Sequence, residues 1–364
     1  MGVDLSKFGV SAAQVADLNH NQTFKYPPIV KGRIAHIDSD FVSYQVSAES
    51  KAELDPNDPT PRKTFEDMLH NAKEAVDHIR LMAGAERAVL HVTHNSDKGG
   101  RCDDAILKPY QANREGREKP EHLDEVRVYL GSGCGDTTGT FVGVIHTSQE
   151  ADDGMAQAHY ADPDNAIICS ADKDLLMVPG WKLDMYTYNV YKVEDDFGWI
   201  ELDRSKSTPK VKGAGTKFFW AQCLMGDAAD NISGLPECPG AIWQEYDGTK
   251  AHADVLAQWI ACDDPVQSAK LDKKLDQLRS KTKKCGAVLT YNLLKDKRTD
   301  KECFNLVRSC YNKLASSHGY EFKHWKTGKV VTPTQALLSE MRLLWMRRYP
   351  DKDDVLHWLK EKSK

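Results

Sequence analysis

The chain has 364 residues, of which 28% are charged and 40% hydrophobic, and its formal net charge is −5. This balance is typical of a globular protein with one large core and a smaller domain, and no apolar run approaches the roughly 18–20 residues of a bilayer-spanning helix. The nine cysteines include no CxxC pair, so we expect reduced thiols and neither disulfides nor a zinc site. The N-terminal stretch lacks an apolar core beside positive charge, so we expect no signal peptide, no membrane association and a cytoplasmic location.

Short β-branched runs alternate with helical patterns in the first part of the chain. Strands are predicted at 33–38, 88–94, 140–146, 165–171 and 186–193, and the helices between them include 64–82 and 150–160. Such alternation predicts an α/β fold with a central, mainly parallel sheet flanked by helices. The glycine-rich stretch 131–139 has no helix after it, so we interpret it as a flexible connection and not as a phosphate-binding loop.

The pattern becomes helical toward the C-terminus. We predict helices at 218–229, 251–260, 267–281, 286–295, 300–316 and 334–348. The expected organisation is an N-terminal extension at 1–30, an α/β core at 31–215 and a helical region at 216–364.

Basic residues are concentrated in two segments despite the negative net charge. Residues 204–217 carry five Lys or Arg and no acid, and 270–301 are again rich in both. A charge run usually indicates only a solvated face. Here the basic segments are separate from a gathered set of acids, which is the arrangement that a phosphodiester substrate at a metal site requires.

Carboxylates follow four successive predicted strands. In chain order they are Asp38 and Asp40, then Asp97, then Glu150, Asp152 and Asp153, and finally Asp172 and Asp174. Because the carboxyl ends of parallel strands meet at one edge of a sheet, we expect these side chains to converge. Residues three apart share a helix face, which pairs Glu150 with Asp153 and, further on, Asp227 with Asp230. His91 and His94 point to opposite faces of a strand and are poor co-ligands.

Divalent cations would relieve the repulsion within such a set. Two unit charges 4 Å apart repel by about 4 kcal/mol at an effective dielectric near 20. Oxygen ligands without His or Cys suit Mg²⁺ or Mn²⁺. Two such ions roughly 4 Å apart are the usual arrangement for in-line displacement at phosphorus, so the acids predict a two-metal phosphodiester hydrolase.

The ordered motifs "IDSD", "DKG…R…YQANR", "EADD", "SADKDLL" and "MGDAADNISGLP" resemble those of the 5′-nuclease or flap endonuclease family, most closely its phage-encoded 5′→3′ exonucleases. The resemblance runs from about 33 to 240. It implies a PIN-like catalytic core with a helical arch at about 101–135, followed by a C-terminal DNA-binding region.

The resemblance also implies the metal ligands. Those of the first ion would be Asp38, Asp97, Glu150, Asp152, Asp153 and Asp172. Those of the second would be Asp174, Asp227 and Asp230, with Asp153 or Asp172 shared. Asp40 has no family counterpart, so we expect it beside the ligands and not among them.

Further residues of the resemblance concern DNA. Arg114 matches an arginine that contacts the scissile phosphate, and Tyr110 matches an aromatic residue that stacks on the terminal base. The family has a lysine where this chain has Gln111, and Lys108 or Arg101 could take its place.

The segment "GLPECPG" (234–240) resembles the first half of a helix–hairpin–helix, in which backbone amides and a bound K⁺ hold a duplex phosphate. The usual "GxK" is missing, and an insertion at about 241–282 precedes 283–294, which would be the displaced second helix. The nucleic-acid contacts expected in addition to Tyr110, Gln111 and Arg114 are Lys210, Lys212, Lys217, Gly234, Gly240, Lys283 and Lys284.

The implied function is a metal-dependent 5′→3′ exonuclease with flap or structure-specific endonuclease activity, acting on DNA and on RNA primer strands in hybrids. It would serve DNA replication or recombination, in a host cytoplasm if phage-encoded, beside a replication polymerase or a single-strand-binding protein. One alternative is a nuclease-fold protein that binds branched DNA without cutting it, although no expected acid is missing. Another is a PIN-type ribonuclease, a class that is generally shorter and lacks "GDAADNISGLP".

Overall fold

The computed structural model of the chain describes residues 26–94, 99–236, 238–239, 251–280 and 282–362. It divides into two compact units. The described residues of unit 1 fall within 26–100, 116–196 and 346–354, and those of unit 2 within 101–115, 197–345 and 355–362. The division near 197 differs from the expected one near 215, because 197–214 forms a hairpin that packs on helices of unit 2.

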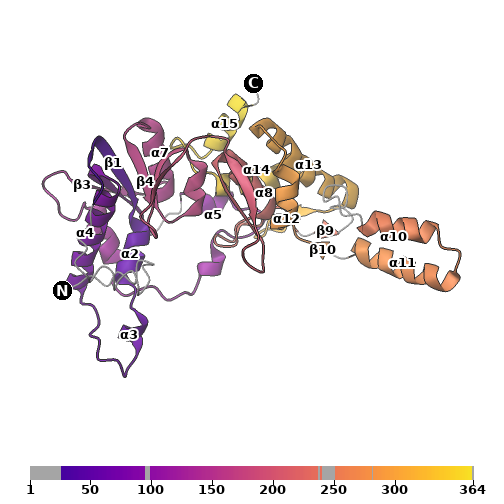
Figure 1. Cartoon of the computed structure of the whole chain (residues 1–364), viewed down its shortest axis with the longest axis horizontal. Helices are drawn as coiled ribbons and strands as arrows, with labels where there is room; N and C mark the ends of the chain where they lie inside the picture. Colours follow the sequence, from indigo (N-terminus) through magenta and orange to yellow (C-terminus); the bar gives the residue numbers. More distant parts are fainter. Residues whose placement is uncertain (1–25, 95–98, 237, 240–250, 281, 363–364) are drawn as a thin grey trace. The chain divides into compact units, whose positions relative to one another are not determined.

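Unit 1 is built around a six-stranded sheet of order β3-β2-β1-β4-β5-β6 (Figure 1). The strands are β1 (Val30–Asp38), β2 (Ala85–Thr93), β3 (Phe141–His146), β4 (Ala166–Ser170), β5 (Gly180–Asp184) and β6 (Val190–Val193). The pairs among β1–β5 are parallel, and β6 is antiparallel to β5. The predicted α/β fold with a mainly parallel sheet is therefore confirmed.

The two faces of the sheet are distinguished by alternate residues of its strands. Ala35, Ile37 and Leu90 belong to an apolar core that they share with the helices α2 (Ser39–Ser47), α4 (Phe65–Met82) and α6 (Leu123–Gly131). Their neighbours His36 and His91 point to the other face, where α7 (Ala151–Ala161) packs on β1, β2 and β4. Burial of the apolar face is the main stabilising contribution here.

Unit 2 is largely helical. Its main helices are α8 (Gly215–Met225), α10 (Ala251–Ile260), α11 (Pro265–Ser280), α12 (Ala287–Leu294), α13 (Asp300–His318) and α14 (Pro333–Leu344). The helix α15 (Asp354–Lys362) follows, and the strands β7 (Trp199–Asp203) and β8 (Lys210–Ala214) form an antiparallel hairpin. Phe219, Trp220, Trp345 and Trp358 pack ring against ring in the core of this unit. The predicted helices at 218–229 and 334–348 end earlier than expected, at Met225 and Leu344.

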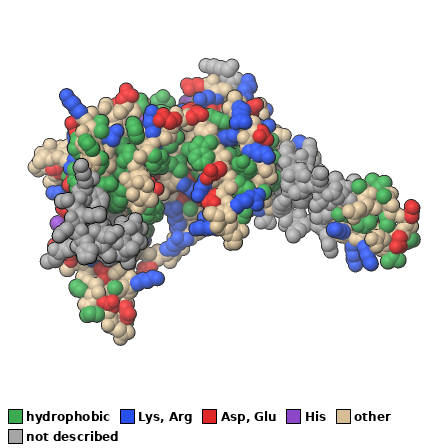
Figure 2. Space-filling view, viewed as in Figure 1, with side chains coloured by type: hydrophobic (Ala, Val, Ile, Leu, Met, Phe, Trp, Pro, Cys, Tyr) green, Lys and Arg blue, Asp and Glu red, His purple; other side chains and the backbone are tan. Residues whose placement is uncertain are grey.

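The helices α10 and α11 run side by side as a hairpin within the predicted insertion (Figure 1). Trp259, Ile260 and Val266 are exposed on it, and Figure 2 shows basic, acidic and apolar side chains together on this hairpin. Within the described ranges, no helix is long and apolar enough to cross a bilayer.

Candidate active site

The carboxyl ends of β1 and β4 mark the point where the strand order reverses, since β2 and β3 lie on one side of β1 and β4 on the other. Open α/β sheets bind their ligands in the crevice at such a point. Asp38 ends β1, and Asp172 follows β4 at the start of a short 3₁₀-helix, Lys173–Met177. Ser170 joins them, because its hydroxyl donates to Oδ2 of Asp38 (3.0 Å) and accepts the N–H of Asp172 (3.0 Å).

Asp38 and Asp172 are difficult to ionise in this position. The pKa of Asp38 is raised to about 6, first by burial and then by the charge of Asp40. The pKa of Asp172 is raised to about 7, first by desolvation among the surrounding residues and then by Asp174, although the residue still reaches solvent. Both shifts disfavour the charged form of the carboxyl, so a bound cation would favour its ionisation.

Asp152 joins these acids from the first turn of α7. Its pKa is raised well above its usual value, first by burial and then by the charges of Asp38, Asp172 and Glu150. Asp174 is 7% exposed, donates its N–H to Oδ1 of Asp172 (2.8 Å) and forms an ion pair with Lys173. Carboxylates from three strand ends thus act on one another within unit 1.

A divalent metal ion fits this donor set chemically. The groups are carboxylates alone, which suits Mg²⁺ or Mn²⁺ better than zinc, and their raised pKa values show that a cation would stabilise the ionised forms. Among the residues that the structure describes, no three His, Cys, Asp or Glu side chains converge closely enough to form a coordination shell. Asp97, an expected ligand, lies outside the described residues.

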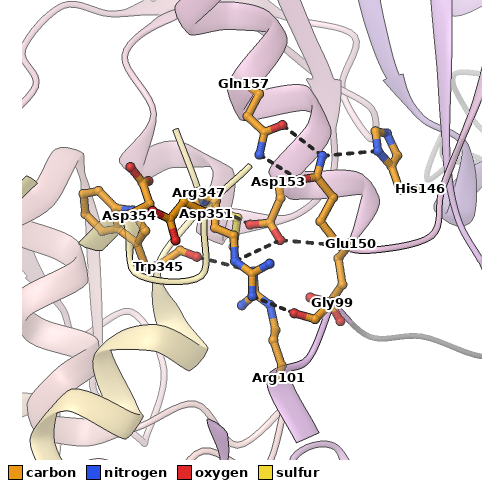
Figure 3. Close-up of polar contacts among 12 residues, drawn as sticks. Gly99, Arg101, His146, Glu150, Asp153, Gln157, Trp345, Arg347, Asp351 and Asp354 are labelled. Carbon is orange, nitrogen blue, oxygen red and sulfur yellow. Dashed lines mark hydrogen bonds and ion pairs between the residues drawn. The ribbon is translucent and has the colours of Figure 1, made fainter. Parts of the chain in front are cut away.

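Asp153 has surroundings different from those that the resemblance implies. It is 0% exposed, and its Oδ1 accepts the backbone N–H of Arg347 (3.0 Å). Its Oδ2 accepts the N–H of Glu150 (3.4 Å) and lies 3.9 Å from Nε of Arg347. Figure 3 shows Asp153 between Arg347 and Glu150. In this structure the carboxylate of Asp153 is therefore used by partners within the protein.

Asp40 lies beside the acids and is held by Arg127 of α6. Nε and Nη2 of Arg127 both donate to Oδ1 of Asp40, at 3.0 and 2.7 Å. The N–H of Thr93 at the end of β2 donates to the same carboxylate, and Nη2 of Arg127 also donates to the carbonyl of Thr93. The result is a salt bridge that fixes the end of β2 next to the end of β1.

Asp227 and Asp230 are displayed by a tight loop in unit 2. Gly226 ends α8 with a φ of +73°, and Gly234 has a φ of +62°. A Cβ added to Gly234 would lie 2.2 Å from the nitrogen of Gly226, so the two ends of the loop touch and both positions require glycine. A pair of hydrogen bonds between Asp227 and Ile232 closes the loop.

The expected phosphate-contacting segment packs on this loop. Arg114 donates from Nη2 to Oδ1 of Asp230 (2.5 Å) and from Nε to the carbonyl of Ala229 (3.3 Å). Gln111 donates from Nε2 to the same oxygen of Asp230 (3.0 Å), and its N–H donates to the carbonyl of Asp230 (2.8 Å). Asp230 is thus neutralised within unit 2, whereas Asp38, Glu150, Asp152 and Asp172 belong to unit 1.

Three of the expected DNA contacts are buried in the structure. Arg101 is 1% exposed, and its guanidinium donates to the carbonyls of Leu343 and Trp345. Tyr110 is 5% exposed, so its ring offers no open face for a base. Lys217 is 5% exposed because it lies in the buried helix α8, and its Nζ donates to the carbonyls of two residues after α12, at 3.0 and 2.8 Å. These three side chains stabilise unit 2.

The remaining expected DNA-contacting residues differ in their exposure and in whether the structure describes them. Lys108, Lys210, Lys212 and Lys284 are exposed, and Lys212 forms an ion pair with Asp203 (2.7 Å). Only the backbone of Lys283 is described, and Gly240 lies outside the described residues.

The amide of Gly234 is already used within the protein. Its N–H donates to Oε2 of Glu340 on α14 (2.6 Å), so the amide expected to hold a phosphate has an internal carboxylate as partner. Burial raises the pKa of Glu340 to about 8.

His91 takes part in a hydrogen-bonded row of imidazoles across three strands. Its Nε2 lies 3.0 Å from Nδ1 of His36, and its Nδ1 lies 2.9 Å from Nε2 of His146. Burial lowers the pKa of His36 to about 4 and that of His91 well below its usual value. These neutral imidazoles satisfy one another's hydrogen-bonding groups on the face of the sheet that α7 covers.

No family model and no curated protein matches this sequence. Among solved structures, the chain is similar to the flap endonuclease of bacteriophage T5 in a pseudo-enzyme–product complex with DNA and metal ions, at 15% identity and a TM-score of 0.40, covering 86% of this chain and 99% of that one. It is also similar to the 5′-exonuclease of T5 with bound zinc, at 16% identity and a TM-score of 0.39, covering 78% and 93%. At these values the likeness carries no information on substrate or chemistry, which have to be argued from the residues.

Proposed function

We propose that this protein is a metal-dependent 5′→3′ exonuclease of the 5′-nuclease family, with flap or structure-specific endonuclease activity on DNA and on RNA primer strands in hybrids. The observation that carries the proposal is the acidic edge of the sheet in unit 1. Burial raises the pKa of Asp38, Asp152 and Asp172 there, and the charges of Asp38 and Asp172 raise that of Asp152 further. Such a set is tenable in its ionised form only with bound cations.

The acids of unit 1 would hold Mg²⁺ or Mn²⁺ at the carboxyl ends of β1 and β4. The proposed ligands within unit 1 are Asp38, Asp97, Glu150, Asp152, Asp172 and Asp174. Asp227 and Asp230 are proposed as metal ligands on the family resemblance alone. Bound divalent ions would supply an activated water and charge stabilisation at the leaving oxygen. Ser170 orients Asp38 through its hydroxyl and Asp172 through the backbone, so two ligands on adjacent strands share one positioning group.

Arg114 is the proposed contact to the scissile phosphate. Its side chain is 47% exposed, and the guanidinium is held by Asp230 and the Ala229 carbonyl. An arginine positioned in this way can keep some of its N–H donors on a protein carboxylate and carbonyl while its other N–H groups donate to a phosphate oxygen. Lys108 is exposed on the same segment and is the proposed substitute for the lysine that Gln111 replaces.

The β7–β8 hairpin is the proposed contact to the duplex. Lys210 and Lys212 are exposed on β8, and the turn between the strands carries Arg204 and Lys206. Side chains of this kind contact phosphates without reading sequence, as a structure-specific nuclease requires.

The deciding experiment uses flapped and nicked duplexes labelled at either end of the cleaved strand. We expect cleavage from the 5′ side with Mg²⁺ and none with EDTA. Asp172→Asn should abolish cutting and leave DNA affinity largely intact. Cleavage that starts at 3′ ends, or that persists without metal, would refute the proposal.

The same experiment separates the alternatives. A protein that binds flaps tightly in Mg²⁺ and never cuts them would be a branched-DNA-binding protein on a nuclease fold. Preference for single-stranded RNA over flapped DNA would indicate a PIN-type ribonuclease.

A further inference from the structure

A segment far along the chain belongs to unit 1. Residues 346–354, which we call the C-terminal strap, are part of this unit although 197–345 belong to unit 2. Nη2 of Arg348 in the strap donates to Asp196 (2.8 Å), and its guanidinium lies over the ring of Tyr160, 4.7 Å from the centroid. The N–H of Met346 points to the sulfur of Met177 (3.5 Å). The strap is thereby attached on both sides of Arg347.

Arg347 is directed from the strap toward the start of α7 (Figure 3). It is 5% exposed. Its backbone N–H donates to Oδ1 of Asp153 (3.0 Å), its Nε lies 3.9 Å from Oδ2, and its Nη2 donates to the carbonyl of Gly99 (2.7 Å). One side chain therefore contacts the first turn of α7 and the backbone that follows β2.

Both contacts of Arg347 lie next to proposed metal ligands. Asp153 is adjacent in sequence to Asp152, and its Oδ2 accepts the N–H of Glu150 (3.4 Å). Gly99 follows Asp97 by two residues, and a Cβ added to it would lie 2.7 Å from Cα of Gln149. The backbone at Gly99 is therefore packed against the residue that precedes Glu150.

We propose that Arg347 is a positioning residue for the proposed metal ligands Glu150 and Asp152 at the start of α7. The inference rests on the proposed function, and it removes Asp153 from the ligand set by giving its carboxylate another partner. The planar guanidinium suits this position because it forms an ion pair with Asp153 and donates a hydrogen bond to the Gly99 carbonyl, whereas a lysine ammonium would be a point charge on a flexible stem.

The test compares Arg347→Met with Arg348→Met as the control. Arg348 also lies in the strap, and its side chain contacts Asp196 and Tyr160, neither of which is a proposed metal ligand. Mn²⁺ affinity is measured by isothermal titration calorimetry on the full chain without DNA, together with the shift in melting temperature on adding Mn²⁺. We expect Arg347→Met to weaken Mn²⁺ binding by about 10–100-fold, the usual effect of removing a partner that orients a ligand. Arg348→Met should bind Mn²⁺ within about twofold of the unchanged protein.

Asp153→Asn distinguishes a positioning pair from a direct ligand. If Asp153 acts only through Arg347, the double variant should bind Mn²⁺ no more weakly than the poorer of the two single variants, because both remove the same contact. If Asp153→Asn is far more damaging than Arg347→Met and the losses add, Asp153 is a ligand and the inference is overturned.

Folding is checked separately by including Arg347→Lys, which keeps the charge in the buried site. A melting temperature near that of the unchanged protein with Mn²⁺ binding weakened by about tenfold supports positioning through the guanidinium fork. Unaltered Mn²⁺ affinity in folded Arg347→Met overturns the inference even if the protein proves to be a nuclease. Weakened Mn²⁺ binding in a protein that cuts nothing supports the inference and refutes the proposed function alone. An unchanged protein that binds no Mn²⁺ overturns both.

Discussion

Arg114 and Asp230 form an ion pair with 2.5 Å between Nη2 and Oδ1, and the side chains remain 47% and 19% exposed. The proposed phosphate contact and a proposed metal ligand are thus paired with each other in the protein alone. Binding of metal and DNA would give each of them a second partner of opposite charge. The pair holds both groups in place until then, at the modest energy of an exposed salt bridge.

Arg114→Gln should lower the turnover number for flap cleavage by about 10²–10³-fold, the range for removing one donor to developing charge. The apparent affinity for DNA should fall far less, because one phosphate contact among many is lost. Single-turnover cleavage with saturating enzyme measures the first quantity and filter binding in Ca²⁺ the second. Arg117→Gln, at an exposed position three residues further on, is the matched control and should cut normally. Equal turnover in both variants would remove Arg114 from the active site.

Asp38→Asn should stabilise the metal-free protein at neutral pH. The pKa of Asp38 is about 6 in the folded protein and about 3.9 in an unfolded chain. The folded state therefore binds more protons between these values, and the unchanged protein loses stability as pH rises through this window. Asn does not titrate, so the variant should gain up to about 3 kcal/mol relative to the unchanged protein between pH 4 and 7. Urea unfolding in EDTA at several pH values measures this gain.

Mg²⁺ provides the control for Asp38→Asn. It should stabilise the unchanged protein at pH 7 and the variant much less, since a proposed ligand is gone. A pH-independent difference between the two proteins would mean that Asp38 ionises normally.

Lys210→Gln should change the salt dependence of DNA binding and not stability, whereas Lys217→Met should change stability and not DNA binding. Lys210 is exposed on β8, and its loss should reduce the slope of log affinity against log salt by about 1 without changing stability. Lys217 is buried and donates to two backbone carbonyls, so its replacement should cost about 1–3 kcal/mol of unfolding free energy and leave the salt slope unchanged. DNA binding at several salt concentrations and denaturant unfolding of both variants check this. A lower salt slope for Lys217→Met would show that the lysine reaches DNA.

Glu340→Gln should make the free energy of unfolding depend less on pH between about 4 and about 8. Burial raises the pKa of Glu340 to about 8, against about 4.3 in an unfolded chain. The unchanged protein should therefore lose up to about 1.4 kcal/mol of stability per pH unit between these values, and the variant should lack this part of the slope. Glutamine can still accept the Gly234 N–H, so the loop should keep its shape. Parallel slopes for the two proteins between pH 5 and 8 would contradict the assignment.

The elements that the sequence predicted well are those with local signals. The helix predicted at 64–82 begins where Thr64 and Asp67 form a capping box, and α14 begins where Thr332, Pro333 and Gln335 do the same. The strand predicted at 186–193 failed in its first half because its turn contains no glycine or proline. There Asp184 accepts the N–H groups of Tyr186 and Thr187, and Tyr188 adopts a φ of +55°.

Several expected site residues are buried against partners that lie far away in the sequence. Arg101 is buried against carbonyls of Leu343 and Trp345, and the partner of Asp153 is Arg347, so both outcomes depend on residues about 200 or more positions away. No local pattern contains that information. Lys217 did carry a signal, because the helix around it, "GTKFFWAQCLM", is apolar on nearly all sides and such helices are buried.

The inclusion of the strap in unit 1 has a consequence for the order in which the parts of this unit are synthesised. The sheet and its acids are translated by residue 196, but the guanidinium that secures the first turn of α7 is added only at position 347. During synthesis, all of 197–345 must leave the ribosome before that turn has its final partner. A nascent or truncated chain that ends before Arg347 would therefore contain every acid of the sheet edge, while the start of α7 would lack the contact that secures it. On the proposed function, tight metal binding would be acquired only after residue 347 has been made.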